Sequence, residues 1–271
     1  MITTSVARTK SIFHTIFLTA TSSESVVVFL HGLGSSQNFY YSIAKKLSSE
    51  HTCIVLDNNG AGRTPLSSPD ISIESMGQDV FNLLLELDLS RRQITLVGHS
   101  MSGMIVNYMN NEFKQKLNIK QNVLLGPVHP TEKISEVFDQ RIQAVQKANS
   151  LSDIANSVLE NAVGTNCTDL RKAFIRELVS GQTIEGYIAN CRVISKAGLQ
   201  SDEFLDLYKN NDKRTLLIIG EDDKTAPWDG CVSLISDNLQ SSEVYLLKGV
   251  GHWHAIEDDE QVLRAIQSFI K

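Results

Sequence analysis

Three polar residues with catalytic potential stand at the ends of separate apolar runs in this 271-residue chain. They are Ser100, Asp223 and His252. A serine hydroxyl attacks a carbonyl carbon when a histidine removes its proton, and a carboxylate can hold that histidine in the required orientation. The three residue types therefore predict nucleophilic catalysis, provided that the fold brings them together.

The serine lies where an apolar run meets a segment with helical character. A sharp strand-to-helix turn strains the backbone of a nucleophile, and small residues two positions on either side prevent a clash between strand and helix. Gly98 meets this requirement on one side, and Ser102 takes the other position, where glycine is usual. Ser102 is the alternative nucleophile, but it would place Met104 where a bulky side chain does not fit. The pattern therefore favours Ser100.

A second apolar run, residues 26–30, ends in a glycine-flanked turn that contains His31 and Leu33. The tetrahedral oxyanion of acyl transfer requires two N–H donors, and one of them is usually the residue after the nucleophile. The backbone N–H groups of Leu33 and Met101 are the candidates. We interpret His31 as a structural residue of this turn rather than as a catalytic base.

The acid and the base each have competitors nearby. Asp223 is the last of three consecutive acidic residues, three positions after Gly220 and four before Pro227, which matches the acid turn of hydrolases with this pattern. His252 follows a glycine on a short loop, where its ring can reach both a serine and an aspartate. His254 is the alternative base.

The order Ser, Asp, His along the chain is that of the α/β-hydrolases, and residues 20–271 resemble this superfamily. Residues 56–64 are similar to its D-x-R-G-x-G-x-S loop, although Asn59 replaces the usual arginine and Thr64 the usual serine. The resemblance implies an α/β fold with a mostly parallel sheet, helices on both faces and an inserted helical cap. Alternation of strand-like and helical segments predicts the same layers.

The apolar spacing after Gly126 changes to a helical period, and this change defines the expected domains. We expect residues 1–127 and 199–271 to form the α/β-hydrolase core, and residues 128–198 to form the cap. Within the cap, two segments are similar to those of 3-oxoadipate enol-lactonases and their relatives, namely residues 139–145 and 185–191.

This similarity implies a small and anionic substrate, which requires a cation in the pocket. Arg141 is the first candidate, with Lys133 and Arg192 as alternatives on the cap. His129 and Trp253 follow strand ends, where the pocket should lie, so both are candidate substrate-binding residues.

Composition limits the partners. The chain is 42% hydrophobic, which is sufficient for a large core, and its net charge of −6 argues against nucleic acid or an anionic membrane as a partner. Four widely spaced cysteines suggest neither a zinc site nor a disulfide framework. No segment contains the roughly 18–20 consecutive apolar residues that cross a membrane, and no secretory signal is evident, so we expect a cytoplasmic protein. The sequence assigns no oligomeric state.

The leading hypothesis is a serine hydrolase that cleaves a carboxylic ester or lactone, with an enol-lactonase as its more specific form. This chemistry requires no organic cofactor and no metal. Two alternatives use the same fold. One is a small-molecule receptor, and the other is an acyltransferase or perhydrolase that employs the same three residues.

Overall fold

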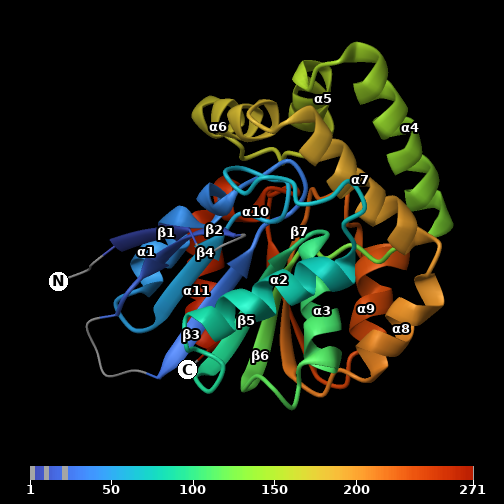
Figure 1. Ribbon diagram of the computed structural model, residues 1–271. Coiled ribbons are helices and arrows are strands. Elements are labelled where there is room, and N and C mark those ends of the chain that lie inside the picture. The colour runs from blue at the N-terminus through green and yellow to red at the C-terminus, as the bar shows by residue number, and fades with distance from the viewer. Residues whose placement is uncertain (1–3, 9–11, 20–23, 271) are drawn as a thin grey trace.

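The computed structural model describes residues 4–8, 12–19 and 24–270 of the chain. Its central sheet has the strand order β1-β2-β4-β3-β5-β6-β7-β8 (Figure 1). Strand β2 is antiparallel to both of its neighbours, β1 and β4, and all other neighbouring strands are parallel. The predicted α/β-hydrolase fold with a mostly parallel sheet is confirmed. The strands are Thr4–Arg8 (β1), Phe13–Phe17 (β2), Ser25–Leu30 (β3), Thr52–Leu56 (β4), Gln93–His99 (β5), Ile119–Leu125 (β6), Arg214–Gly220 (β7) and Ser242–Leu247 (β8).

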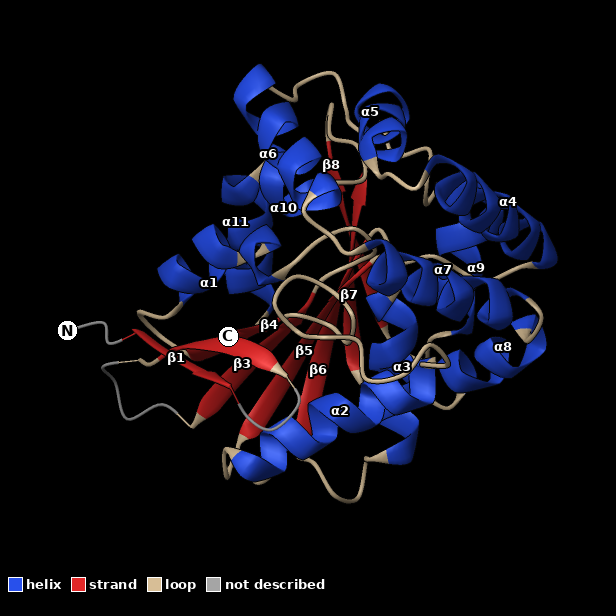
Figure 2. Cartoon of the chain, turned by 45° about the horizontal axis from the view of Figure 1, so that its top comes forward, coloured by secondary structure: helices blue, strands red, loops and turns tan. Residues whose placement is uncertain are grey.

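The central strands are apolar on both sides because each side packs against helices. In β3, Val26 and Val28 belong to one hydrophobic cluster, and Val27 and Phe29 belong to another on the opposite face. Figure 2 shows α1 and α11 on one side of the sheet and α2 and α3 on the other. The helices of these two layers are Tyr41–Leu47 (α1), Ile73–Glu86 (α2), Ser102–Glu112 (α3), Ser201–Lys209 (α8), Ser233–Asn238 (α9), His254–Glu257 (α10) and Asp259–Phe269 (α11), with short turns at Gln37–Phe39 (η1) and Trp228–Val232 (η2).

Four further helices lie between β6 and β7, and Figure 1 places them together at the top of the molecule. We call residues 128–198 the cap segment. The longest helices of this segment, α4 and α7, pack against each other, and α5 packs against α6. A small third hydrophobic cluster, formed around Val145, Leu151 and Tyr187, joins α4, α7 and the start of α5. The helices are Glu132–Ala148 (α4), Ser152–Asn161 (α5), Asp169–Ser180 (α6) and Ile184–Gly198 (α7).

The start of each cap helix except α5 is fixed by a threonine that accepts a backbone N–H. These residues are Thr131, Thr168 and Thr183, and each is extended, as expected of a helix N-cap. In the part of the chain that the structure describes, no helix has both the length and the apolar character needed to cross a membrane.

Candidate active site

The turn between β5 and α3 holds Ser100 in a strained backbone conformation. Ser100 has φ +55°, one of few non-glycine residues in the described chain with a positive value. Its N–H donates to the Leu125 carbonyl on the neighbouring strand at 2.9 Å, which fixes the turn to the sheet. A Cβ at Gly98 would lie 2.7 Å from the Ser102 carbonyl oxygen, so only glycine fits there. The local sequence therefore satisfies the steric demands of a nucleophile turn.

Ser102, the alternative nucleophile, binds groups of two neighbouring turns instead of a histidine ring. Its hydroxyl donates to the His31 carbonyl at 2.6 Å, and it also accepts an N–H from the Asn58 side chain at 3.2 Å. The His31 ring accepts the Asn58 backbone N–H at 3.0 Å and donates to the Gly32 carbonyl at 2.7 Å. Ser102 and His31 therefore hold the turn after β3 against the turn after β5.

Ser100, His252 and Asp223 form a continuous chain of hydrogen bonds. His252 Nε2 lies 2.9 Å from Ser100 Oγ, and His252 Nδ1 lies 2.8 Å from Asp223 Oδ2. An ionised carboxylate can only accept, so Nδ1 carries the hydrogen and Nε2 is free to accept the serine proton. All three residues are buried.

Asp223 remains ionised although it is buried. Burial alone would raise its pKa, but the neighbouring His252 and the backbone N–H of Ala226 outweigh burial and hold the pKa of Asp223 well below its usual range. Its second oxygen, Oδ1, accepts the N–H groups of Thr225 and Ala226 at 2.8 and 2.9 Å. The turn that follows β7 thus orients the carboxylate toward the histidine.

Gly126, at the end of β6, makes room for this pair. It has φ +46°, and a Cβ there would lie 2.5 Å from His254 Cε1 and 2.8 Å from Asp223 Oδ2. Any side chain at this position would displace the acid or its neighbour, so the absence of a Cβ is a condition for the observed geometry.

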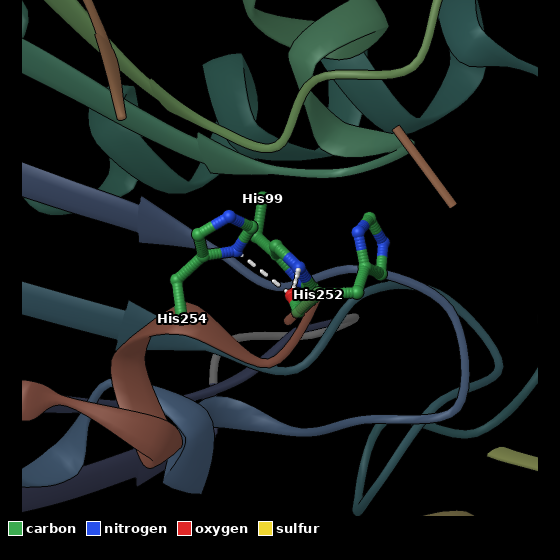
Figure 3. A group of neighbouring side chains, drawn as sticks. All are labelled: His99, His252 and His254. Carbon is green, nitrogen blue, oxygen red and sulfur yellow. Dashed lines mark hydrogen bonds between the residues drawn. The ribbon is translucent and has the colours of Figure 1, made fainter. Parts of the chain in front are cut away.

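Two further histidines hold the backbone of His252. We call residues 249–253 the histidine loop. Figure 3 shows that the rings of His99 and His254 both point toward the carbonyl oxygen of His252, and their N–H groups donate to it at 2.7 and 2.8 Å. Burial lowers the pKa of both imidazoles, that of His254 to about 4, so both rings are neutral at pH 7.

The same three histidines have the spacing of a metal site, since one ligand atom from each lies within 4.8 Å of the others. His252 uses its ring nitrogens toward Ser100 and Asp223, and the other two rings bind its carbonyl. Because both ring nitrogens of His252 are already used, a metal bound to this ring would break its hydrogen bond to Ser100 or to Asp223. The arrangement fits a support for the histidine loop rather than a metal centre.

The two candidate oxyanion donors lie beside the serine. Leu33 and Met101 both line the cavity that contains Ser100. Within the described residues, neither backbone N–H donates to a protein acceptor. Two donors of this kind can receive the oxygen of a polarised carbonyl.

The chain was also compared with known proteins. A model of the alpha/beta hydrolase fold family matches residues 25–259. The chain belongs to the alpha/beta hydrolase family. It is 26% identical over 260 residues to "Non-heme chloroperoxidase CPO-A1" of Kitasatospora aureofaciens, covering 90% of this chain and 91% of that protein.

Solved structures share the fold at low sequence identity. A thermophilic esterase from Thermogutta terrifontis has a TM-score of 0.85 and 20% identity, covering 99% of this chain and 96% of that one. The enol-lactonase from Burkholderia xenovorans LB400 has a TM-score of 0.84 and 18% identity, covering 96% of both chains. The present chain thus shares the architecture of these two enzymes.

The active-site cavity of this hydrolase lies between the sheet edge and the cap segment. Its volume is about 390 Å³, which suits a small substrate. Its wall is mostly apolar, with Val128, Phe138 and Val158 among the contributing side chains. Arg141 is the only Lys, Arg, Asp or Glu among the lining residues that the structure describes.

Arg141 lies in the cavity without an acidic partner. Its guanidinium carbon is 4.9 Å from the centroid of the Phe138 ring, and its positive charge opposes the rise that burial causes in the pKa of Tyr187. Among the described side chains, no carboxylate lies within 4.0 Å of it. The alternatives Lys133 and Arg192 do not line the cavity.

The two remaining predicted contacts are placed differently. Trp253 lines the cavity next to His252. His129 does not line it, because its ring turns toward α8, where Nε2 lies 3.1 Å from Ser201 Oγ and Nδ1 lies 3.4 Å from the Tyr208 hydroxyl. The placement of His129 gives no support to the predicted substrate contact and assigns it to packing below the cap segment.

Sequence reasoning missed the residues that support the base. His99, His254 and Glu257 all bind the backbone of the histidine loop. No local signal marked Glu257, because it is the first of four consecutive acidic residues, 257–260, and such a run is typical of a solvated turn.

Proposed function

We propose that this hydrolase cleaves a carboxylic ester or lactone through an acyl-enzyme formed on Ser100. The observation that carries the proposal is the uninterrupted hydrogen-bond chain from Ser100 through His252 to Asp223. Each residue has the protonation state that its role requires: an acceptor nitrogen faces the hydroxyl, and an ionised carboxylate faces the ring N–H.

The reaction follows from these positions. Ser100 Oγ attacks the carbonyl carbon while its proton passes to His252 Nε2, and the resulting imidazolium is stabilised by Asp223. The oxyanion accepts hydrogen bonds from the N–H groups of Leu33 and Met101. The intermediate collapses when His252 returns the proton to the leaving oxygen, which leaves the acyl group on Ser100.

Water completes the cycle. His252 removes a proton from a water molecule, whose oxygen attacks the acyl carbon, and the second intermediate releases the acid and restores Ser100. With an ester, the alcohol leaves after the first step. With a lactone, the leaving hydroxyl remains attached to the acyl group, and the product is a single hydroxy or keto acid.

The cap segment supports a more specific proposal about the substrate. We assign residues 128–198 as a cap domain that selects the substrate, because its helices supply Phe138, Arg141 and Tyr187 to the cavity wall. A guanidinium without a protein counter-charge in an apolar cavity favours a substrate that carries a carboxylate. A small lactone that carries a carboxylate would suit both the small apolar cavity and the free guanidinium. The more specific proposal is therefore an enol-lactonase.

The test is labelling with a fluorophosphonate probe, followed by a substrate panel. The wild-type protein should be labelled, Ser100→Ala should not, and activity should extend across short esters and lactones with a preference for those that carry a carboxylate. A wild-type protein that binds small lactones but is neither labelled nor active would support the receptor alternative. Products in which an added alcohol or peroxide takes up the acyl group in preference to water would support the acyltransferase or perhydrolase alternative.

A further inference from the structure

Glu257 is a buried carboxylate that the proposed reaction does not use. It lies at the end of α10 and is 1% exposed. Oε2 accepts the N–H groups of Gly164 and Gly251 at 2.7 and 3.0 Å, and Oε1 accepts the N–H of Trp253 at 2.9 Å. Gly251 and Trp253 are the residues immediately before and after His252, so one carboxylate holds the base from both sides.

The partners of Glu257 are backbone dipoles rather than a cation. In the described part of the chain, no Lys, Arg or His forms an ion pair with it. Burial raises the pKa of Glu257, while the N–H groups of Gly251, Gly164 and Trp253 oppose that effect. Two carboxylate oxygens can accept all three N–H groups, whereas a glutamine would turn an NH₂ group toward at least one of them.

The third donor belongs to the cap segment. Gly164 lies in the connection between α5 and α6, and a Cβ there would lie 2.5 Å from both the Gly249 carbonyl oxygen and the Gly251 nitrogen. In the same connection, the Ala162 carbonyl accepts the His252 N–H at 2.8 Å. The backbone of the cap connection is thus packed directly on the histidine loop, and Glu257 lies where the two meet.

We propose that Glu257 is a positioning residue that fixes the His252 ring between Ser100 and Asp223 and attaches the α5–α6 connection of the cap segment to the histidine loop. The catalytic part of this inference rests on the proposed function. The carboxylate does not touch the substrate, and it acts through the backbone N–H groups on either side of the base. A displacement of about 1 Å in a catalytic group can cost about 10²-fold in rate.

The experiment compares the full-length wild-type protein with Glu257→Gln, Glu257→Asp and Glu260→Gln. Glu260 is a matched control because it lies three residues further on and pairs with Arg264 at the surface. For each protein we would measure active-site concentration, kcat and KM for p-nitrophenyl acetate, the fluorophosphonate labelling rate, the pH profile of kcat/KM and thermal unfolding.

Glu257→Gln should lower kcat per active site by roughly 10–10²-fold with a KM change below about threefold. Its labelling rate should fall in proportion, because labelling depends on the same Ser100–His252 pair. The acid limb of its pH profile should move to lower pH, since removal of a buried negative charge makes the imidazolium less stable. Glu257→Asp keeps the charge and should give an intermediate kcat, and Glu260→Gln should match the wild type.

A Glu257→Gln protein with kcat per active site within twofold of the wild type and an unchanged acid limb would overturn the proposal. A Gln variant without a cooperative unfolding transition would also overturn it, since Glu257 would then be a folding residue only. Failure of the proposed function is distinguishable, because the wild-type protein itself would then show neither labelling nor turnover.

Discussion

The two walls of the active-site cavity are constructed differently. On the sheet side, Ser100, Asp223 and His252 are buried and held by hydrogen bonds to backbone groups. On the cap side, α4 and α5 bury few of their side chains, and the cavity surface there is mainly apolar. Directional contacts fix geometry within tenths of an ångström, whereas apolar contacts mainly set shape. The difference leads us to predict that reactivity and substrate choice can be changed separately in this protein.

The strongest test of the sheet side is removal of the three proposed catalytic residues. Ser100→Ala, His252→Ala and Asp223→Asn should each lower kcat by roughly 10³–10⁶-fold with folding intact, and the losses should not add because the residues act as a unit. Steady-state kinetics and circular dichroism would measure both effects. Ser102→Ala is the comparison variant, because its hydroxyl binds the His31 carbonyl and the Asn58 side chain and does not contact His252. Loss of activity in the Ser102 variant alone would contradict the assignment.

The second prediction concerns the stability of the histidine cluster. The unfolded chain protonates His254 near pH 6.5, whereas the folded protein does so only at about pH 4. Between these values the unfolded state holds more protons, so stability rises with pH and is lost on acidification. The free energy of unfolding should therefore be roughly 3 kcal/mol higher above pH 6.5 than below pH 4 because of His254 alone.

Urea unfolding at several pH values measures this contribution. His254→Asn keeps an N–H donor for the His252 carbonyl but does not titrate, so its stability should depend less steeply on pH between about 4 and 6.5. Equal slopes for the variant and the wild type would show that His254 does not remain neutral in the folded protein.

The third prediction tests the tight packing under the acid. Gly126→Ala should lower kcat by about 10²-fold, because the added Cβ would displace Asp223 or His254. Gly230→Ala is a matched control: Gly230 also has a positive φ, +70°, but nothing lies within 4 Å of a Cβ there. The control should cost only about 1–2 kcal/mol of stability from backbone strain and keep its activity. Similar kinetics for both variants would mean that the site tolerates the displacement.

The smallest expected effect lies on the cap side. Arg141→Ala should lower kcat/KM for carboxylate-bearing lactones. The loss of transition-state stabilisation should be roughly 1.5–3 kcal/mol, as for a charged hydrogen bond, and kcat/KM for neutral esters should change little. Arg192→Ala, on the same cap segment but outside the cavity, should leave both substrates unaffected. Equal losses on anionic and neutral substrates would remove Arg141 from substrate recognition and weaken the enol-lactonase proposal.

The sequence was most informative where chemistry coincides with the end of a strand. Parallel strands end at one edge of a sheet, so Ser100 and Asp223, which follow β5 and β7, could be expected to meet there. The predicted fold is confirmed, and the structure brings these residues together with His252 within hydrogen-bond distance. Their catalytic roles remain predictions.

The support around the base could not be read from local patterns. His99 reaches the His252 carbonyl across 153 residues, and Glu257 binds Gly164 across 93. Such contacts depend on the paths of distant loops, which apolar periodicity does not encode. The same reason explains His129: its position near a strand end was correct, but its ring packs toward α8, which was not expected as a separate helix.

The docking of the α5–α6 connection on the histidine loop has a consequence for refolding. The backbone N–H of His252 binds the Ala162 carbonyl, and its ring binds Ser100. His252 therefore reaches its final position only after segments far apart in the sequence have all assembled. Helices form from local contacts and precede such distant pairings. After dilution from denaturant, helical circular dichroism should therefore return before esterase activity, and activity would report the last step of assembly.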